Sequence, residues 1–167
     1  MSSFVDTLGV PASAIEFHYN TVDERTRRAP KHSKTLLKGF EPIQVIGAVG
    51  VSWRLHTSNG QEVRQPSVRK AFTECISDDE EHNGEGTDNR HIKSIVRLRD
   101  YHAASTPHYF LLNNDAITVG EHGDLVKDSF RLPPTRDRLA IYHYAVKSRE
   151  EMEAKMSRGN GMDQPKA

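Results

Sequence analysis

The segment 43–55 predicts a strand buried inside a sheet. Its sequence, IQVIGAVGVSWRL, is rich in β-branched residues and apolar on both faces, which is typical of a strand covered on both sides. The longest apolar run of the chain, residues 45–51, lies within this segment; Gly47 and Gly50 interrupt this run, which is far shorter than the roughly 20 residues that a membrane-spanning helix needs. Asn59-Gly60 follows, and this pair readily adopts the positive φ angles of a tight turn. We therefore expect a central strand that ends in a turn.

Further along the chain, hydrophobic spacing predicts one helix and several strands. Apolar residues recur at helical spacing over 68–76, so an amphipathic helix is expected there. The acidic, glycine-containing stretch 77–89 behind it predicts a mobile loop. Alternation and β-branched or aromatic content predict strands at 92–98, 109–112, 116–119 and 139–144, with Asn113-Asn114-Asp115 joining the middle two as a hairpin.

The clearest local signal is a helix start near the end of the chain. A glutamate lies three residues after Ser148, which is the spacing of a capping box, so a helix is expected to begin at Ser148 and end near Gly159. Near the other end, the basic stretch 23–38 predicts a solvated loop that leads into a short helix. Residues 4–10 are expected to form the end of a strand.

Strands separated by short helices and long loops, with a strongly apolar strand in the middle, indicate an α/β or α+β sheet. The 167 residues suffice for one ordinary domain. The 23 basic and 23 acidic residues cancel, so no overall charge attracts the chain to nucleic acid, and no nucleic-acid partner is expected. No signal peptide and no membrane span are visible in this chain.

Few residues stand out as candidates for chemistry by their type alone. Cys75 is the sole cysteine, which excludes an internal disulfide, and its expected role is a small buried or half-buried side chain. The nine histidines include no pair at metal-ligand spacing on a predicted helix, so most are expected at the surface. Taken singly, His143 would be a hydrogen-bonded packing residue and Trp53 a core residue.

The most specific motif is residues 141–159, IYHYAVKSREEMEAKMSRG, in which a strand ends with a histidine just before a capped, charged helix. It resembles the closing signature of family-92-like glycosyltransferases, a His-Tyr, then Lys-Ser, then a glutamate-rich helix that ends Lys-x-x-Arg-Gly. Residues 50–60 and 93–109 resemble two further blocks of that family in order and spacing. The closing signature falls on His143, Tyr144, Lys147, Ser148, Glu150, Glu151, Lys155, Arg158 and Gly159.

The resemblance implies a glycosyltransferase of the GT-A type, family-92-like or family-2-like. The fold would be α/β, a partial GT-A-like mixed sheet with flanking helices and long loops. Residues 1–159 would form the C-terminal portion of this domain and residues 160–167 a flexible tail. The activity would be the transfer of a hexose from a nucleotide sugar to a glycan acceptor.

The resemblance also implies a divalent metal, manganese, held by an Asp-x-Asp-Glu-Phe motif against the donor diphosphate. The nearest stretch is Phe4-Val5-Asp6-Thr7-Leu8, which keeps one acid of this motif, so the motif is expected to be truncated or degenerate. No catalytic residue is assigned. The implied metal ligands are Asp6, His108 and His143, and the implied substrate-binding residues are Trp53, Arg54, Ser58, Gly60, Lys93 and Lys147.

The predicted elements also suggest where a site would lie. In open α/β sheets, ligands gather at the carboxyl ends of strands, and the amides at a helix start favour anions. His143 is placed at a strand end just before such a helix start. We therefore expect His143, Lys147 and Trp53 to border one cleft, with His108 nearby.

Two other interpretations stay open. A non-catalytic glycosyltransferase-like fragment would act as a carbohydrate- or protein-binding module. An unrelated interaction domain would use the acidic loop 78–88 and the basic segment 25–38 as partner surfaces. An upstream anchor would place the full-length protein in the Golgi or another membrane-associated compartment, and without an anchor it would be cytoplasmic.

Overall fold

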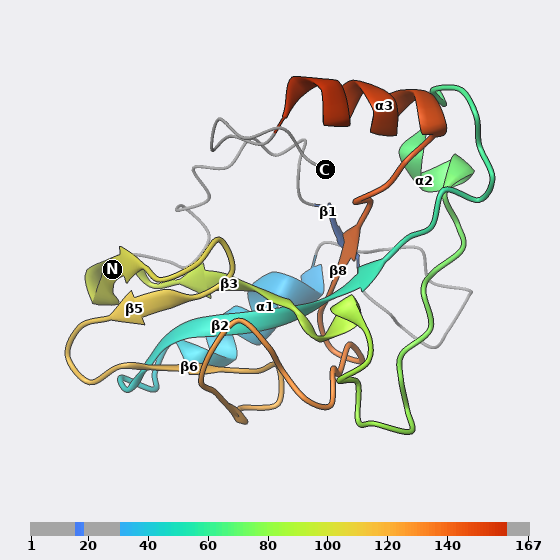
Figure 1. The fold of residues 1–167 in the computed structure, drawn as a ribbon. Helices are drawn as coiled ribbons and strands as arrows, with labels where there is room; N and C mark the ends of the chain where they lie inside the picture. The colour runs from blue at the N-terminus through green and yellow to red at the C-terminus, as the bar shows by residue number, and fades with distance from the viewer. Residues whose placement is uncertain (1–15, 19–30, 160–167) are drawn as a thin grey trace. The chain divides into compact units, whose positions relative to one another are not determined.

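The computed structural model describes residues 16–18 and 31–159 (Figure 1). The chain falls into two compact units. The first unit consists of the chain up to Trp53 together with residues 78–142, and the second consists of residues 54–77 together with the chain from His143 onward. Each unit is therefore assembled from two separate stretches of sequence. The predicted strand end at 4–10 and the predicted tail at 160–167 lie outside the described residues.

A mixed sheet organises the first unit around its longest strand, β2 (Ile46–Leu55). The strand order is β1-β8-β2-β6-β7, and β3 also pairs with β2. The β2–β6 pair is parallel, whereas β2–β3, β6–β7 and β1–β8 are antiparallel. The expected α/β class with a mixed sheet is thus confirmed at this level. The other strands are β1 (Glu16–His18), β3 (Ile92–Val96), β6 (Ile117–Val119), β7 (Leu125–Val126) and β8 (Ala140–His143).

The burial of β2 explains the two glycines in its sequence. Every residue of this strand except Arg54 is buried. A Cβ atom on Gly47 would lie 2.8 Å from the Ala116 Cβ, and one on Gly50 would lie 2.7 Å from the Ile92 Cδ1. Glycine at these positions therefore lets neighbouring segments approach β2 closely. The predicted central strand is confirmed, but it begins at Ile46 because residues 43–45 form turns after the preceding helix.

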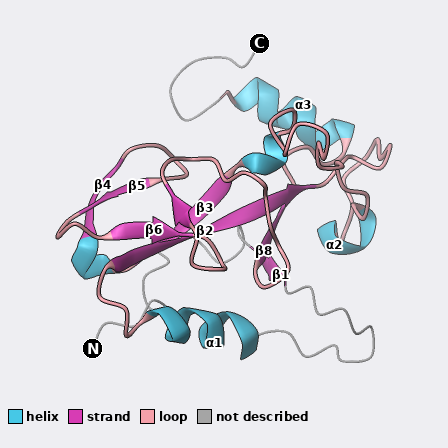
Figure 2. Ribbon diagram, turned by 90° about the horizontal axis from the view of Figure 1, so that it is seen from below, coloured by secondary structure: helices cyan, strands magenta, loops and turns pink. Residues whose placement is uncertain are grey.

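Helix α1 (Lys31–Phe40) lies along one face of the sheet that contains β2 and β6 (Figure 2). Its buried apolar side chains are Leu36, Leu37 and Phe40. The buried Arg97 guanidinium, just after β3, donates hydrogen bonds to the carbonyls of Phe40 and Glu41 at 3.4 and 3.1 Å. These bonds satisfy carbonyls at the helix end and fix this end of α1 to the sheet.

The predicted hairpin across Asn113-Asn114-Asp115 is wrong in its pairing. Both predicted strands exist, as β5 (Phe110–Leu112) and β6, and Asn114 and Asp115 have the positive φ angles of a turn. However, β5 pairs with β4 (Tyr101–Ala104), which the sequence pattern did not predict, and β6 pairs with β2 and β7. A turn signal is local, whereas the choice of partner strand depends on distant residues.

The acidic stretch 77–89 was expected to be a mobile loop, but polar contacts hold both of its ends. Asp78 forms an ion pair with Arg136, with 2.7 Å between carboxylate oxygen and guanidinium nitrogen. Asn89, fully buried, donates a hydrogen bond to Asp78 at 2.9 Å. One short 3-10 turn lies at the end of this stretch, at Asp88–Arg90, and another lies just after β3, at Leu98–Asp100.

In the second unit, the helix predicted over 68–76 ends early. Helix α2 spans Val68–Ala71, and the chain then continues in extended form. The Thr57 amide donates to the Glu74 carbonyl and the Ile76 amide to the Leu55 carbonyl, each at 2.9 Å. Sheet-like pairing with the end of β2 therefore replaces further helical hydrogen bonds. Cys75 is exposed in this extended segment rather than buried as expected.

The second helix of this unit is α3 (Arg149–Arg158), which begins and ends as the sequence predicts. The Ser148 hydroxyl accepts a hydrogen bond from the Glu151 amide, and Gly159 follows the last turn with a φ of 76°. Among the described residues, no helix has the length and apolar character needed to cross a membrane.

Candidate functional site

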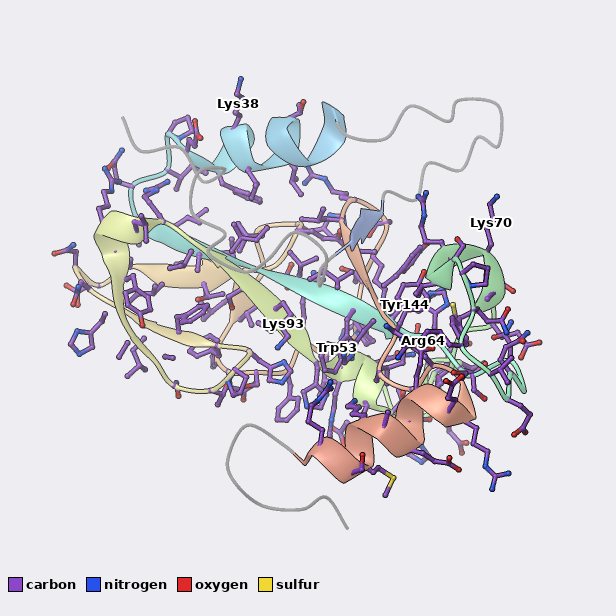
Figure 3. All side chains as sticks on the ribbon, turned by 90° about the horizontal axis from the view of Figure 1, so that it is seen from above. Lys38, Trp53, Arg64, Lys70, Lys93 and Tyr144 are labelled. Atoms are coloured by element: carbon purple, nitrogen blue, oxygen red, sulfur yellow. The ribbon has the colours of Figure 1, made fainter. Side chains whose placement is uncertain are left out.

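A hollow of about 340 Å³ lies within the second unit, along α3 and the chain just before it. We call it the α3 pocket. Figure 3 shows Arg64 and Tyr144 beside this helix. Most of the side chains that line it are polar or charged, so it differs from an apolar cavity of the core. The lining residues are Arg64, Tyr144, Ala145, Lys147, Glu151, Met152, Ala154, Lys155 and Arg158.

Helical spacing places three of these charged side chains together. Glu151, Lys155 and Arg158 follow one another at intervals of four and three residues, so they share one face of α3. Lys147 comes directly before the helix cap at Ser148. The cap itself is fully buried, which holds the start of α3, and hence Lys147, in place.

The charges of the α3 pocket favour an anion. Four cationic side chains line it against one carboxylate, which gives a net charge of 4 − 1 = +3. That carboxylate, Glu151, lies 3.6 Å from the Lys147 Nζ and 3.8 Å from the Arg64 Nε. Lys155 donates a hydrogen bond to the Ala145 carbonyl at 2.9 Å. One carboxylate cannot neutralise this many cations, so the pocket attracts negative charge.

The amides at the start of α3 are already used, which corrects one expectation. The Arg149 and Glu150 amides donate to the carbonyls of Gln61 and Glu62 at 3.0 Å, and the Glu151 amide donates to Ser148. A helix start binds anions through amides that have no other acceptor. Any anion in the α3 pocket is therefore held by side chains.

Ser58 and Gly60, both predicted to bind substrate, belong to the turn that leads into Gln61 and Glu62. The Gln61 amide donates to the Ser58 carbonyl at 2.9 Å, and Asn59 and Gly60 have φ angles of 48° and 68°. The Ser58 hydroxyl accepts a hydrogen bond from the Gly60 amide at 3.3 Å. The predicted Asn-Gly turn is confirmed, and the contacts of Ser58 and Gly60 are those of turn residues.

Two other predicted residues, Arg54 and His143, also belong to the second unit. Arg54 is half-buried near the end of β2. The carbonyl of His143 accepts a hydrogen bond from the His56 amide at 3.0 Å, at the end of β8. The His56 ring in turn packs against Tyr144, with 4.5 Å between ring centroids, and Tyr144 lines the α3 pocket.

Three predicted residues of the first unit, Trp53, Lys93 and His108, lie together (Figure 3 labels the first two). The Trp53 ring centroid is 5.1 Å from that of His108 and 5.9 Å from the Lys93 Nζ. Trp53 is only 7% exposed, and its indole N–H donates to the Asp88 carbonyl at 2.5 Å. A ring this buried packs in the core, as its residue type alone predicts, and offers little surface to a sugar.

Burial changes the acid–base behaviour of both polar members of this group. The pKa of His108 is lowered overall. Burial is the largest cause and the Lys93 charge acts in the same direction, whereas the hydrogen bond from Nδ1 to the Ile92 carbonyl raises the pKa. Burial likewise lowers the pKa of Lys93, whose Nζ donates to the Pro107 carbonyl at 2.8 Å. Both groups therefore lose protons more readily than they would in water.

This shift predicts that His108 makes the protein acid-sensitive. The unfolded chain binds a proton at His108 below about pH 6.5, whereas the folded protein resists it, so stability falls as pH drops from 7 toward the lowered folded pKa. In His108→Asn, the side-chain amide N–H can donate to the Ile92 carbonyl in place of the Nδ1–H, and this amide does not titrate. We expect urea denaturation from pH 7 to pH 5 to show a smaller loss of stability in this variant than in the unmodified protein. The exposed His102→Asn is the control, and equal slopes for all three proteins would contradict the assignment.

Of the predicted manganese ligands, Asp6 lies outside the described residues, and His108 and His143 belong to different units. Within the described residues, the one close group of three candidate ligands is Glu121, His122 and Asp137, whose ligand atoms lie within 4.8 Å of one another. The His122 Nε2 already hydrogen-bonds to the Asp137 Oδ1 at 2.7 Å, beside the buried Glu121 carboxylate. Manganese binding stays a prediction.

Trp53, His143 and Lys147 are expected from the sequence to border a single cleft. Trp53 belongs to the first unit and the other two to the second, so this cleft stays a prediction. The sequence pattern did not identify Arg64 as a site residue. Its amide donates to Glu150, 86 residues away, at 2.7 Å, and a contact of that sequence separation leaves no local signal.

Comparisons with known proteins add no assignment: no family model, no curated protein and no solved structure matches the chain.

Proposed function

We propose that this chain is part of a GT-A-type glycosyltransferase that moves a hexose from a nucleotide sugar to a glycan, and that the α3 pocket holds the donor diphosphate. One observation carries the proposal. Residues of the closing signature, on which the resemblance rests, line this one positively charged pocket. They are Tyr144, Lys147, Glu151, Lys155 and Arg158.

The chemistry of sugar transfer explains why such a pocket is needed. As the bond to the sugar breaks, negative charge builds up on the leaving diphosphate, and fixed cations that face it lower the barrier. Arg158 and Arg64 present planar guanidinium groups that fit two phosphate oxygens at once, whereas Lys147 and Lys155 act as compact point charges. The net charge of +3 suits a diphosphate better than a singly charged ligand.

The fold is compatible with the finer proposal of a partial GT-A sheet. GT-A-type enzymes belong to the α/β class, and the mixed sheet around β2, with a parallel β2–β6 pair, supports membership of this class. The proposal assigns no base for the acceptor hydroxyl. Fold class alone would not identify an activity, so the α3 pocket remains the main support.

Binding of nucleoside diphosphates tests the proposal directly. UDP, GDP and ADP are titrated calorimetrically into the purified chain, and at least one should bind. Lys147→Ala and Arg158→Ala should each weaken that binding about tenfold or more, because each removes a charged contact to phosphate. Lys38→Ala and Lys70→Ala are matched controls, since both lysines are exposed and neither lines the α3 pocket (Figure 3).

The outcomes separate the alternatives. Equal losses in the Lys38 and Lys70 variants would show that binding follows overall charge, and no binding of any diphosphate would reject the proposal. If a diphosphate binds, the matching nucleotide sugars are assayed for release of the sugar with and without manganese. Binding without sugar release under either condition would identify the chain as the non-catalytic relative.

A further inference from the structure

A second hollow, of about 280 Å³, lies within the first unit, between β7 and the turn that precedes β3. We call it the Arg90–Phe130 pocket. None of the residues singled out from the sequence lines it, and the proposed function does not use it. The lining residues are Arg90, Asp124, Leu125, Val126, Lys127, Asp128, Phe130, Arg131 and Leu132.

Arg90 is held in this pocket by packing rather than by an acceptor. Its guanidinium carbon lies 4.7 Å from the centroid of the Phe130 ring. Its Nε is buried, and within the described part of the chain no residue accepts a hydrogen bond from this side chain. The Nε is closed off from solvent, whereas the two terminal nitrogens of this half-buried side chain are not among the buried atoms, so these two can donate to an acceptor that a ligand brings.

The other arginine of the pocket shows the contrast. Arg131 donates to both carboxylate oxygens of Asp124, at 2.7 and 2.6 Å, and these charges neutralise each other. The remaining carboxylate, Asp128, accepts a hydrogen bond from the Phe130 amide at 2.7 Å. Arg90 is thus the guanidinium of this pocket that keeps its hydrogen-bonding capacity for a ligand.

Charge and surface character define the ligand further. Three cations and two carboxylates line the pocket, a net charge of 3 − 2 = +1, whereas the α3 pocket carries +3. A charge of +1 matches a monoanion rather than a diphosphate. Exposed apolar side chains form part of the lining, and their exposed fractions are 54% for Leu125, 38% for Phe130 and 40% for Leu132. These can cover the carbon face of a ring, while a charged group fixes its orientation.

We propose that the Arg90–Phe130 pocket binds a carboxylate-bearing sugar, a uronic acid, of the glycan acceptor. The planar guanidinium of Arg90 meets the two carboxylate oxygens side by side, and the apolar residues contact the C–H face of the sugar ring. This names the acceptor class of the transferase and so rests on the proposed function. The binding step itself needs neither a donor nor catalysis.

Binding of matched sugars without any nucleotide tests the inference. Oligoglucuronate and the neutral oligoglucoside of the same length are titrated into the chain by calorimetry. The acidic sugar should bind at least about tenfold more tightly, and Arg90→Gln should remove this preference. Phe130→Ala should weaken binding of the acidic sugar, because it removes both ring contact and the support under Arg90. Circular dichroism of each variant checks that the fold is kept.

Arg158→Gln separates this inference from the proposed function. It should weaken diphosphate binding and leave uronate binding unchanged, while Arg90→Gln should do the reverse. If no nucleoside diphosphate binds in any experiment but the uronate still binds, the proposed function alone is rejected. Equal affinity for the acidic and neutral sugars, or an Arg90→Gln variant that binds uronate normally, would overturn the inference. A sulfated oligosaccharide that binds more tightly than the uronate would also overturn it, because a carboxylate would then not be the preferred anion.

Discussion

Replacing Arg136 with methionine is expected to lower the free energy of unfolding by about 3–5 kcal/mol. The Arg136 side chain is 4% exposed, and its two terminal nitrogens donate to the Asp78 oxygens at 2.7 and 2.9 Å. It also donates to the carbonyls of Trp53 and Asn89 at 2.6 and 3.2 Å. Methionine fills much of the same space but leaves a partly buried carboxylate and two buried carbonyls without this donor. That loss, rather than lost packing, is the reason for the large effect.

Chemical denaturation monitored by circular dichroism measures this change. Arg99→Met is the matched control: Arg99 is 52% exposed, bonds to Gln44 at 2.6 Å, and should change stability by less than about 1 kcal/mol. Adding Asp78→Asn to Arg136→Met should recover part of the loss, because the uncompensated charge is then removed. If Arg136→Met proved as mild as Arg99→Met, the ion pair with Asp78 would not hold the acidic stretch in place.

The second large effect is expected at Trp53, where alanine should lower the free energy of unfolding by about 3–5 kcal/mol. The ring is 7% exposed and packs against His91 and His108, with centroids at 4.9 and 5.1 Å. Removing it leaves a cavity beside two polar rings and takes one hydrogen-bond donor, the indole N–H, from the Asp88 carbonyl, which still accepts from the His91 amide. Trp53→Phe retains most of the apolar contact and should cost clearly less than alanine.

The same pair of variants decides between the two roles considered for this residue. Thermal and urea denaturation report on a core role, and the titrations with diphosphates and sugars report on a binding role. A Trp53→Ala protein of normal stability with impaired sugar binding would restore the interpretation of Trp53 as a substrate contact. A strong loss of stability in Trp53→Ala, and a much smaller loss in Trp53→Phe, is the outcome that burial predicts.

Sequence patterns predicted the features that depend on neighbouring residues. Ser148 with a glutamate three residues later predicts the start of α3, because both capping groups come from one turn of chain. Asn59-Gly60 predicts its turn because the required φ angles are properties of these residue types. The central strand β2 follows from its own apolar sequence, although Ile43 and Val45 lie outside it and are exposed.

Predictions of features that depend on residues distant in sequence were wrong, or the features were not predicted at all. The spacing of Val68 to Ile76 fits a helix, yet α2 stops at Ala71 because Glu74 and Ile76 pair with the end of β2. In the same way, β6 has a recognisable sequence, but nothing within it reveals that β2 is its parallel partner. The pocket-lining pair Arg90 and Phe130, 40 residues apart, was not identified for the same reason.

The assembly of the second unit from two stretches has a consequence for synthesis on the ribosome. Residues 54–77 emerge first. The carbonyls of Gln61 and Glu62 in this stretch accept hydrogen bonds from the amides of Arg149 and Glu150, which are synthesised much later. The whole intervening stretch must leave the exit tunnel before these contacts form, and closing so long a loop slows folding. Until then the segment 54–77, which carries the fully buried Phe72, lacks the later stretch of its own unit. A nascent chain arrested before His143 therefore exposes this segment to chaperones and proteases.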